Sequence, residues 1–104
     1  MNAKFGKAFE KAVLKAVDLK KNSRRVESMT KKYRVPDAFA DGVLLEIKGT
    51  KRLDLTKQVT DFLFAASSEG RKVVFAVTHE TKLSNSFREL VESGEVIVVR
   101  FKPQ

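Results

Sequence analysis

The stretch from Lys32 to Lys48 reads KYRVPDAFADGVLLEIK and decides the fold of this chain. In its middle, Asp41-Gly42 is a typical dipeptide of a two-residue β-hairpin turn, because such a turn needs a positive φ that glycine adopts easily. With these two residues as the turn, Asp37 lies directly opposite Glu46, and their Cβ atoms are expected about 5 Å apart. Strand alternation puts Lys48 on the same face as Glu46.

Two carboxylates that lie opposite each other on a sheet repel, so this arrangement needs a compensating positive charge. A hard divalent cation such as Mg²⁺ prefers oxygen ligands, and it is usually held by one or two carboxylates together with water and substrate phosphate. Lys48 beside such an ion is suited to orient a water or to offset charge on a phosphate. The simpler interpretation is an ordinary strand with one wet face. The register-matched Asp37 favours the metal site.

Composition limits the class of protein. The chain has 104 residues, 42% of them hydrophobic, as expected for one globular domain over residues 1–104. It contains no cysteine, which excludes a disulfide framework and a cysteine-ligated zinc site. The net charge of +8 indicates a polyanionic partner, either nucleic acid or an anionic membrane surface. No apolar run is long enough to span a membrane, and we expect no signal peptide because the N-terminus lacks an apolar core.

Hydrophobic periodicity predicts three helices, at 3–18, 55–69 and 85–92. Five strands are expected, at 24–29, 33–38, 43–48, 72–78 and 95–101. Asp54 and Ser84 are the expected N-caps, and Gly70 marks the end of the second helix. Because a strand, a helix and another strand in succession indicate a crossover connection, the predicted fold class is α/β with a mixed central sheet flanked by helices.

Pro36-Asp37, followed by Glu46-Ile47-Lys48 at the end of an apolar strand, resembles the PD-(D/E)xK signature of the restriction-endonuclease-like nucleases. In that superfamily an αβββαβ core carries the acid pair and the lysine on its second and third strands, which agrees with the order predicted here. Further stretches extend the resemblance, roughly from Phe5 to Phe101, to the C-terminal toxin domains of bacterial polymorphic toxins of the contact-dependent inhibition and Rhs type. These stretches are FEKAV from Phe9, VPD from Val35, LLEIKGTKRLDLTKQ from Leu44, TKLS from Thr81 and IVVRF from Ile97.

The resemblance implies a metal-dependent endonuclease that hydrolyses phosphodiester bonds of DNA or transfer RNA. Such a toxin acts in the bacterial cytoplasm after delivery from a neighbouring cell. By position, the resemblance implies Asp37, Glu46 and Glu10 as ligands of one or two Mg²⁺ or Mn²⁺ ions. It also implies Lys48 as the catalytic lysine and Gln58 as a catalytic group from the second helix. A dedicated immunity protein would inhibit the enzyme, and we expect that protein to be acidic because the chain is basic.

Four basic side chains are expected to contact the substrate backbone without reading its sequence: Lys51, Arg52, Lys57 and Lys82. Two other interpretations stay open. A housekeeping or phage nuclease of the same superfamily, such as a junction resolvase or a repair enzyme, would prefer branched DNA. A non-catalytic nucleic-acid-binding module would bind without cleaving, although the intact Asp37, Glu46 and Lys48 argue against it. The sequence does not choose between DNA and RNA.

Overall fold

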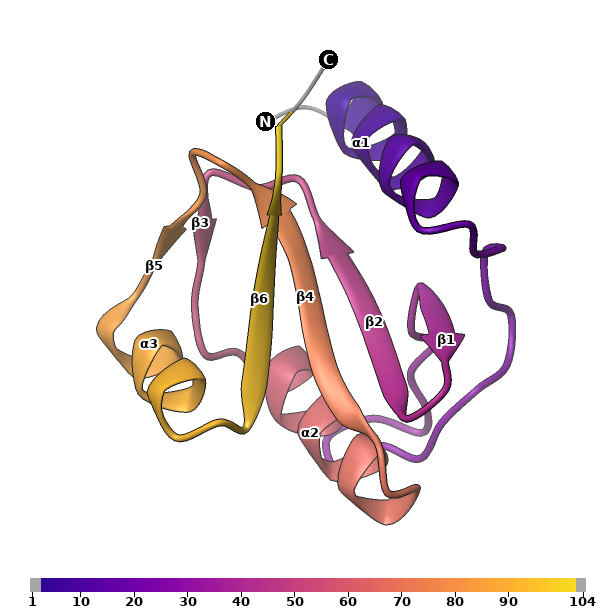
Figure 1. Cartoon of the computed structure of the whole chain (residues 1–104). Coiled ribbons are helices and arrows are strands. Elements are labelled where there is room, and N and C mark those ends of the chain that lie inside the picture. The colour runs from indigo at the N-terminus through magenta and orange to yellow at the C-terminus, as the bar shows by residue number, and fades with distance from the viewer. Residues whose placement is uncertain (1–2, 103–104) are drawn as a thin grey trace.

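The computed structural model describes residues 3–102, so the two residues at each end of the predicted 1–104 domain lie outside it. Figure 1 shows three helices around a central sheet, with a second, very small sheet at one side. In chain order the elements are α1 (Ala3–Ala16), β1 (Ala38–Ala40), β2 (Val43–Lys48), β3 (Arg52–Leu53), α2 (Lys57–Ser68), β4 (Lys72–Thr78), β5 (Lys82–Leu83), α3 (Asn85–Glu92) and β6 (Val96–Phe101).

The central sheet has the strand order β1-β2-β4-β6. β1 pairs antiparallel with β2, whereas β2, β4 and β6 run parallel to one another. The parallel pairs are joined through α2 and through α3, as crossover connections require. The predicted α/β class with a mixed sheet is therefore confirmed.

The hairpin of β1 and β2 has the predicted turn and register. Gly42 has a φ of +68°, which a residue with a side chain rarely adopts. Ala40 pairs with Val43, and Ala38 pairs with Leu45. β1 is only three residues long, and Pro36, which has no N–H to donate to a ladder, lies just before it. The ladder therefore begins directly after Asp37.

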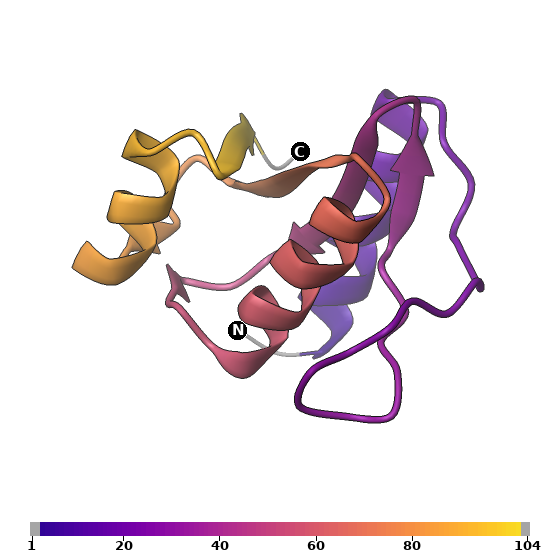
Figure 2. The same ribbon diagram turned by 90° about the horizontal axis from the view of Figure 1, so that it is seen from below.

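The strand predicted at 24–29 is wrong, and the strand predicted at 33–38 is shifted to β1, Ala38–Ala40. Residues 22–36, which we call the 22–36 segment, form an extended loop whose one bridge pairs Val26 with Arg34. Its backbone is held by a side chain instead of a neighbouring strand, because the N–H groups of Met29 and Thr30 donate to Oδ1 of Asp61 at 3.0 and 3.1 Å. Figure 2 shows the segment looping past the flank of α2, which carries that aspartate.

Three further details differ from the predictions. The N-cap of α2 is Thr56 and not Asp54, since Oγ1 of Thr56 accepts the N–H of Val59 at 3.3 Å. Leu55 accordingly lies outside the helix and is 42% exposed. β3 and β5 were not expected, because two residues are too short for a hydrophobic period; they pair parallel, with Arg52 opposite Lys82. By contrast, Ser84 caps α3 as predicted.

The sheet separates two apolar clusters. α2 and α3 pack on one face, where the buried residues are Val26, Leu44, Leu53, Val59, Phe62, Ala65, Ala66, Val73, Phe75, Val77, Phe87 and Val96. α1 packs on the other face, with Phe9, Val13, Leu14, Ala38, Leu45, Ile47 and Ala76. Because side chains alternate along β2, Glu46 and Lys48 share the α2 face with Leu44. None of the helices that the structure describes is long and apolar enough to cross a membrane.

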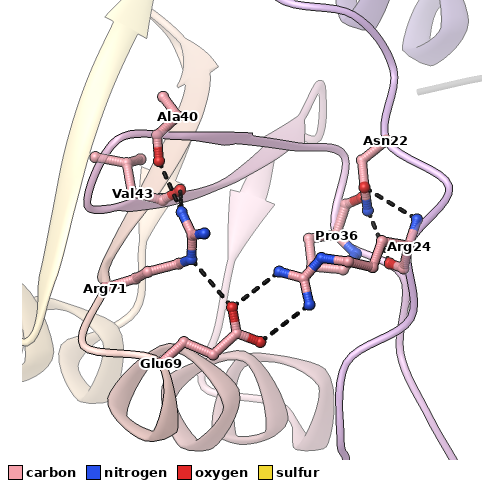
Figure 3. Close-up of polar contacts among 7 residues, drawn as sticks. All are labelled: Asn22, Arg24, Pro36, Ala40, Val43, Glu69 and Arg71. Atoms are coloured by element: carbon pink, nitrogen blue, oxygen red, sulfur yellow. Dashed lines mark hydrogen bonds and ion pairs between the residues drawn. The ribbon is translucent and has the colours of Figure 1, made fainter.

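A polar clamp fixes the hairpin and the 22–36 segment to the end of α2 (Figure 3). The Glu69 carboxylate accepts hydrogen bonds from Arg24 at 2.8 Å and from Arg71 at 3.1 Å. Arg71 also donates to the carbonyl oxygen of Ala40 at 2.8 Å. The side-chain amide of Asn22 donates to the carbonyl oxygen of Pro36 at 3.0 Å. These contacts hold the backbone on both sides of Asp37.

Candidate active site

Two carboxylates meet where the hairpin ladder begins. Asp37 and Glu46 are both buried, with exposed fractions of 8% and 4%. The backbone N–H of Asp37 donates to Oε1 of Glu46 at 3.2 Å. The backbone N–H of Ile47 donates to Oδ2 of Asp37 at 2.8 Å. The two-residue turn thus brings the acids together, as the register predicts.

Lys48 extends this pair towards α2. Its Nζ lies 3.4 Å from Oε2 of Glu46 and donates to Oε1 of Gln58 at 2.6 Å. Gln58 lies in the first turn of α2, which begins at Lys57 directly after the N-cap residue Thr56. The amide oxygen of Gln58 therefore orients the ammonium group of Lys48, and the sequence prediction that these side chains lie together holds.

Glu10 reaches the same site from α1, but not directly. Nζ of Lys21 lies 2.8 Å from Oε1 of Glu10 and also bonds to Oδ1 of Asp37. The side chain of Lys21 is about half exposed and that of Glu10 is 31% exposed. One ammonium group thus bridges an acid of the first helix to an acid of the hairpin.

The negative charges of Asp37 and Glu46 are not fully compensated by the neighbouring positive charge. Burial and the negative charge of Asp37 raise the pKa of Glu46 from its ordinary value of 4.5 to about 8. The ammonium group of Lys48 acts in the opposite direction but is outweighed. In the absence of a further cation the pair therefore retains a proton near neutral pH. The place where Asp37 adjoins Glu46 is where a positive charge would be most stabilising.

This donor set fits a hard divalent cation. Two adjacent carboxylates match the oxygen ligands by which proteins usually hold Mg²⁺. Within residues 3–102, however, no three His, Cys, Asp or Glu side chains are gathered closely enough to hold a metal on their own. The structure brings together two of the three predicted ligands, Asp37 and Glu46, and Lys21 stands between them and Glu10.

The basic side chains predicted to bind the substrate lie at the small sheet of β3 and β5 and at the start of α2. The backbone N–H of Lys82 donates to the carbonyl oxygen of Lys51 at 2.9 Å, so β3 and β5 present Lys51, Arg52 and Lys82 together. These three side chains are exposed, as is Lys57 in the first turn of α2. A cavity of about 210 Å³ opens beside them, lined by Lys48, Thr50, Arg52, Leu53, Asp54, Thr56, Gln58 and Val59.

Two residues of this region were missed by sequence reasoning. Lys21 lies in a polar break after α1, and no spacing connects it to Asp37, which is 16 residues away. Asp61 gave a fainter signal: it precedes the buried Ala65 by one helical turn, so a helical projection places it near the apolar stripe of α2. Both act through long-range contacts that a local pattern does not encode.

The comparison with protein families gives one match. The family model described as restriction endonuclease fold toxin 7 matches residues 6–87, which include most of α1, the hairpin, α2 and β4. The match supports the predicted restriction-endonuclease-like fold and the resemblance to polymorphic toxins. No curated protein and no solved structure matches the chain.

Proposed function

Because the chain belongs to the restriction endonuclease fold toxin 7 family, we propose that it is a Mg²⁺-dependent endonuclease that hydrolyses the phosphodiester bonds of DNA or transfer RNA. The observation that carries this proposal is the contact between the buried Asp37 and Glu46, with Lys48 at 3.4 Å from the second acid. A buried like-charge pair beside a lysine is costly for stability, and it is useful in a site that binds a cation and a phosphate.

In this proposal Asp37 and Glu46 are the principal metal ligands, with Mn²⁺ as a substitute for Mg²⁺. When bound, the ion supplies charge that polarises the scissile phosphate and makes an attacking water more acidic. Neither carboxylate needs to move far, because each already has one oxygen fixed by a backbone N–H. Fixed ligands reduce the reorganisation needed during the reaction.

Lys48 is proposed as the catalytic lysine. Its ammonium group is held by Gln58 and Glu46, so it is aimed at the water or the phosphate oxygen next to the acid pair. A fixed positive charge there stabilises the negative charge that builds up on the phosphate. Gln58 is a positioning residue in this scheme, since its contact is with Lys48.

The basic side chains around the small sheet are proposed to bind the substrate backbone. Arg52 lines the 210 Å³ cavity together with Lys48, and Lys82 lies opposite Arg52 in the small sheet. Lys51 directly precedes β3, and Lys57 is the first residue of α2. Contacts of this kind neutralise phosphates without reading bases, so binding should weaken as salt rises. No base-reading zinc finger is possible without cysteine.

As a toxin, the enzyme is proposed to act in the cytoplasm of a bacterial target cell after delivery from a neighbour. A dedicated immunity protein is the partner expected for such a toxin. The net charge of +8 favours an acidic surface on that protein, since opposite charges accelerate association. Inhibition of cleavage by that protein, weaker at high salt, is the corresponding measurement.

The decisive test incubates the protein with plasmid DNA and with total transfer RNA, each with Mg²⁺ and with a chelator. We expect cleavage of at least one substrate that depends on Mg²⁺ and is lost in Glu46→Gln. Glu89→Gln on the exposed side of α3 makes the same charge change away from the site and should cleave as the wild type does. Binding of both nucleic acids without cleavage would favour the binding module. A strong preference for branched DNA would favour the housekeeping nuclease.

A further inference from the structure

Lys21 is the strongest feature of the site that the proposed mechanism does not use. Its ammonium group contacts Oε1 of Glu10 at 2.8 Å and also Oδ1 of Asp37. Burial acts to lower the pKa of Lys21, but hydrogen bonds to Asp37 and Glu10 raise it above its ordinary value. Lys21 is therefore charged at neutral pH. The positive charge of Lys21 therefore lies between two proposed metal ligands, Asp37 and Glu10.

The backbone next to Lys21 is fixed, whereas its side chain is held only at the ammonium group and is half exposed. The next residue, Asn22, donates its N–H to the carbonyl oxygen of Asp37 at 2.8 Å, and its side chain bonds to Pro36 at 3.0 Å. The Lys21 side chain itself is 52% exposed. A lysine side chain has several rotatable bonds, so a rotation into solvent would release both carboxylates without moving the chain.

We propose that Lys21 is an internal competitor of the metal: its ammonium group holds Glu10 and Asp37 in the metal-free protein and swings into solvent when a divalent cation binds. This inference rests on the proposed metal dependence. Release of Lys21 would also free Glu10 to approach the ion, directly or through water. The full set of three acids would then assemble around the metal and not before it.

The physical consequence is a lower metal affinity than the three acids would otherwise have. A ligand that binds one of two states must overcome the contacts that stabilise the other state. Two ion pairs of a half-exposed lysine are broken here, which corresponds to about a three- to tenfold weaker affinity. Removing the ammonium group should therefore tighten metal binding, although it removes a native contact.

The test is calorimetric titration of Mn²⁺ into the full chain without nucleic acid. Lys21→Gln should bind Mn²⁺ about three- to tenfold more tightly than the wild type. Lys20→Gln, one residue away and exposed, makes the same charge change and should bind as the wild type does. Lys21→Arg keeps the charge and should not bind more tightly than the wild type. Circular dichroism and thermal melts with chelator establish that each variant is folded.

Each result separates this inference from the proposed function. If the wild type binds Mn²⁺ but Lys21→Gln binds equally or more weakly, Lys21 is no competitor and only this inference fails. If Lys20→Gln tightens binding as much as Lys21→Gln does, the effect is one of net charge and the inference again fails. If neither the wild type nor Lys21→Gln binds Mn²⁺, the proposed metal dependence fails together with it. A second readout is the rise in melting temperature with added Mn²⁺, which should be largest in Lys21→Gln.

Discussion

The protein buries two carboxylates near α2 in opposite ways. Asp61 is fully buried and accepts hydrogen bonds from two backbone N–H groups, from the Thr30 hydroxyl and from Nε of Arg34 at 2.9 Å. Glu46 is almost as buried, but it lies against another acid, Asp37, and the charge of Lys48 at 3.4 Å does not compensate for this. The first carboxylate is surrounded by donors, and the second faces a like charge.

The pKa values follow from this difference. Burial by itself would raise the pKa of Asp61, but hydrogen bonds from Thr30, Arg34 and Ser28 hold it well below its ordinary range. For Glu46, burial and the charge of Asp37 act in the same direction and raise the pKa to about 8. A buried acid held in its charged form by donors stabilises a fold, whereas a buried acid whose pKa is raised by a second acid is a candidate ligand for a cation.

The largest expected effect comes from substitutions at Glu46 and its neighbour Lys48, the proposed catalytic half of this comparison. Glu46→Gln and Lys48→Met should each lower Mg²⁺-dependent cleavage by about a thousandfold, because the first removes a charged metal ligand and the second removes the ammonium group next to the reacting phosphate. The melting temperature of Glu46→Gln in chelator should equal or exceed that of the wild type, since the variant lacks the buried carboxyl group that must take up a proton on folding. Cleavage rates and melts on the same preparations check this. Full activity in Glu46→Gln would contradict the assignment.

The next largest effect is on stability and concerns Asp61. Asp61→Asn should lower the free energy of unfolding by about 3 kcal/mol, because Arg34 and two backbone N–H groups lose a charged acceptor in a buried place. Asp41→Asn in the hairpin turn is the matched control, since asparagine suits that turn equally well. Urea titration measures both. At temperatures where it is folded, Asp61→Asn should retain cleavage, and a selective loss of cleavage would argue that the two sites are not separate.

The two acids should also give opposite pH dependences. With chelator, Glu46 is protonated when folded and ionised when unfolded between about pH 4.5 and 8, so the free energy of unfolding falls as pH rises through that window. We expect a decrease of several kcal/mol across this window, because each unit of pKa difference corresponds to about 1.4 kcal/mol. Asp61 contributes stability above its ordinary pKa that is lost only as the pH falls below it.

Urea titrations at several pH values test this contrast. The decrease towards pH 8 should be absent in Glu46→Gln and should shrink with saturating Mn²⁺, because a bound cation favours the ionised pair. The loss on acidification should be smaller in Asp61→Asn. An identical slope between pH 5 and 8 in the wild type and Glu46→Gln would show that the pair does not hold a proton.

The smallest expected effect concerns the segment that Asp61 anchors. Residues 22–36 carry five basic residues and one acidic one, and the exposed Lys31 and Lys32 have no acidic partner among the described residues. In a Glu46→Gln background, Lys31→Gln with Lys32→Gln should reduce the slope of log affinity against log salt by about 1 to 2. The control pair is Lys4→Gln with Lys7→Gln on α1. Fluorescence anisotropy with labelled DNA and RNA measures the slopes, and equal slopes for both pairs would exclude a specific role of the segment.

The features that could be predicted from the sequence are those that depend on residues close together in the chain. Asp41 and Gly42 set a two-residue turn, and the turn alone fixes which residue lies opposite Glu46. The helices α2 and α3 and the parallel strands follow from periodicity and length in the same way. Gln58 could be placed near Lys48 because the connection from the end of β2 to the first turn of α2 is short.

The remainder depends on contacts that no local pattern contains. Val26 and Ser28 alternate with charged residues as in a strand, yet the neighbouring backbone donates to Asp61, 31 and 32 residues away. Lys21 is likewise one of twenty-one basic residues, and only the folded chain brings it between Glu10 and Asp37. Residues that act across the fold are therefore the ones that sequence reasoning leaves out.

The most direct test of the metal-dependent site is a crystal structure with Mn²⁺ and an anomalous difference map. We expect a peak within about 2.1 Å of one oxygen of Asp37 and one oxygen of Glu46, with Nζ of Lys21 withdrawn from Asp37. A map at saturating Mn²⁺ without a peak at this pair, or with the ion held elsewhere, would contradict the account.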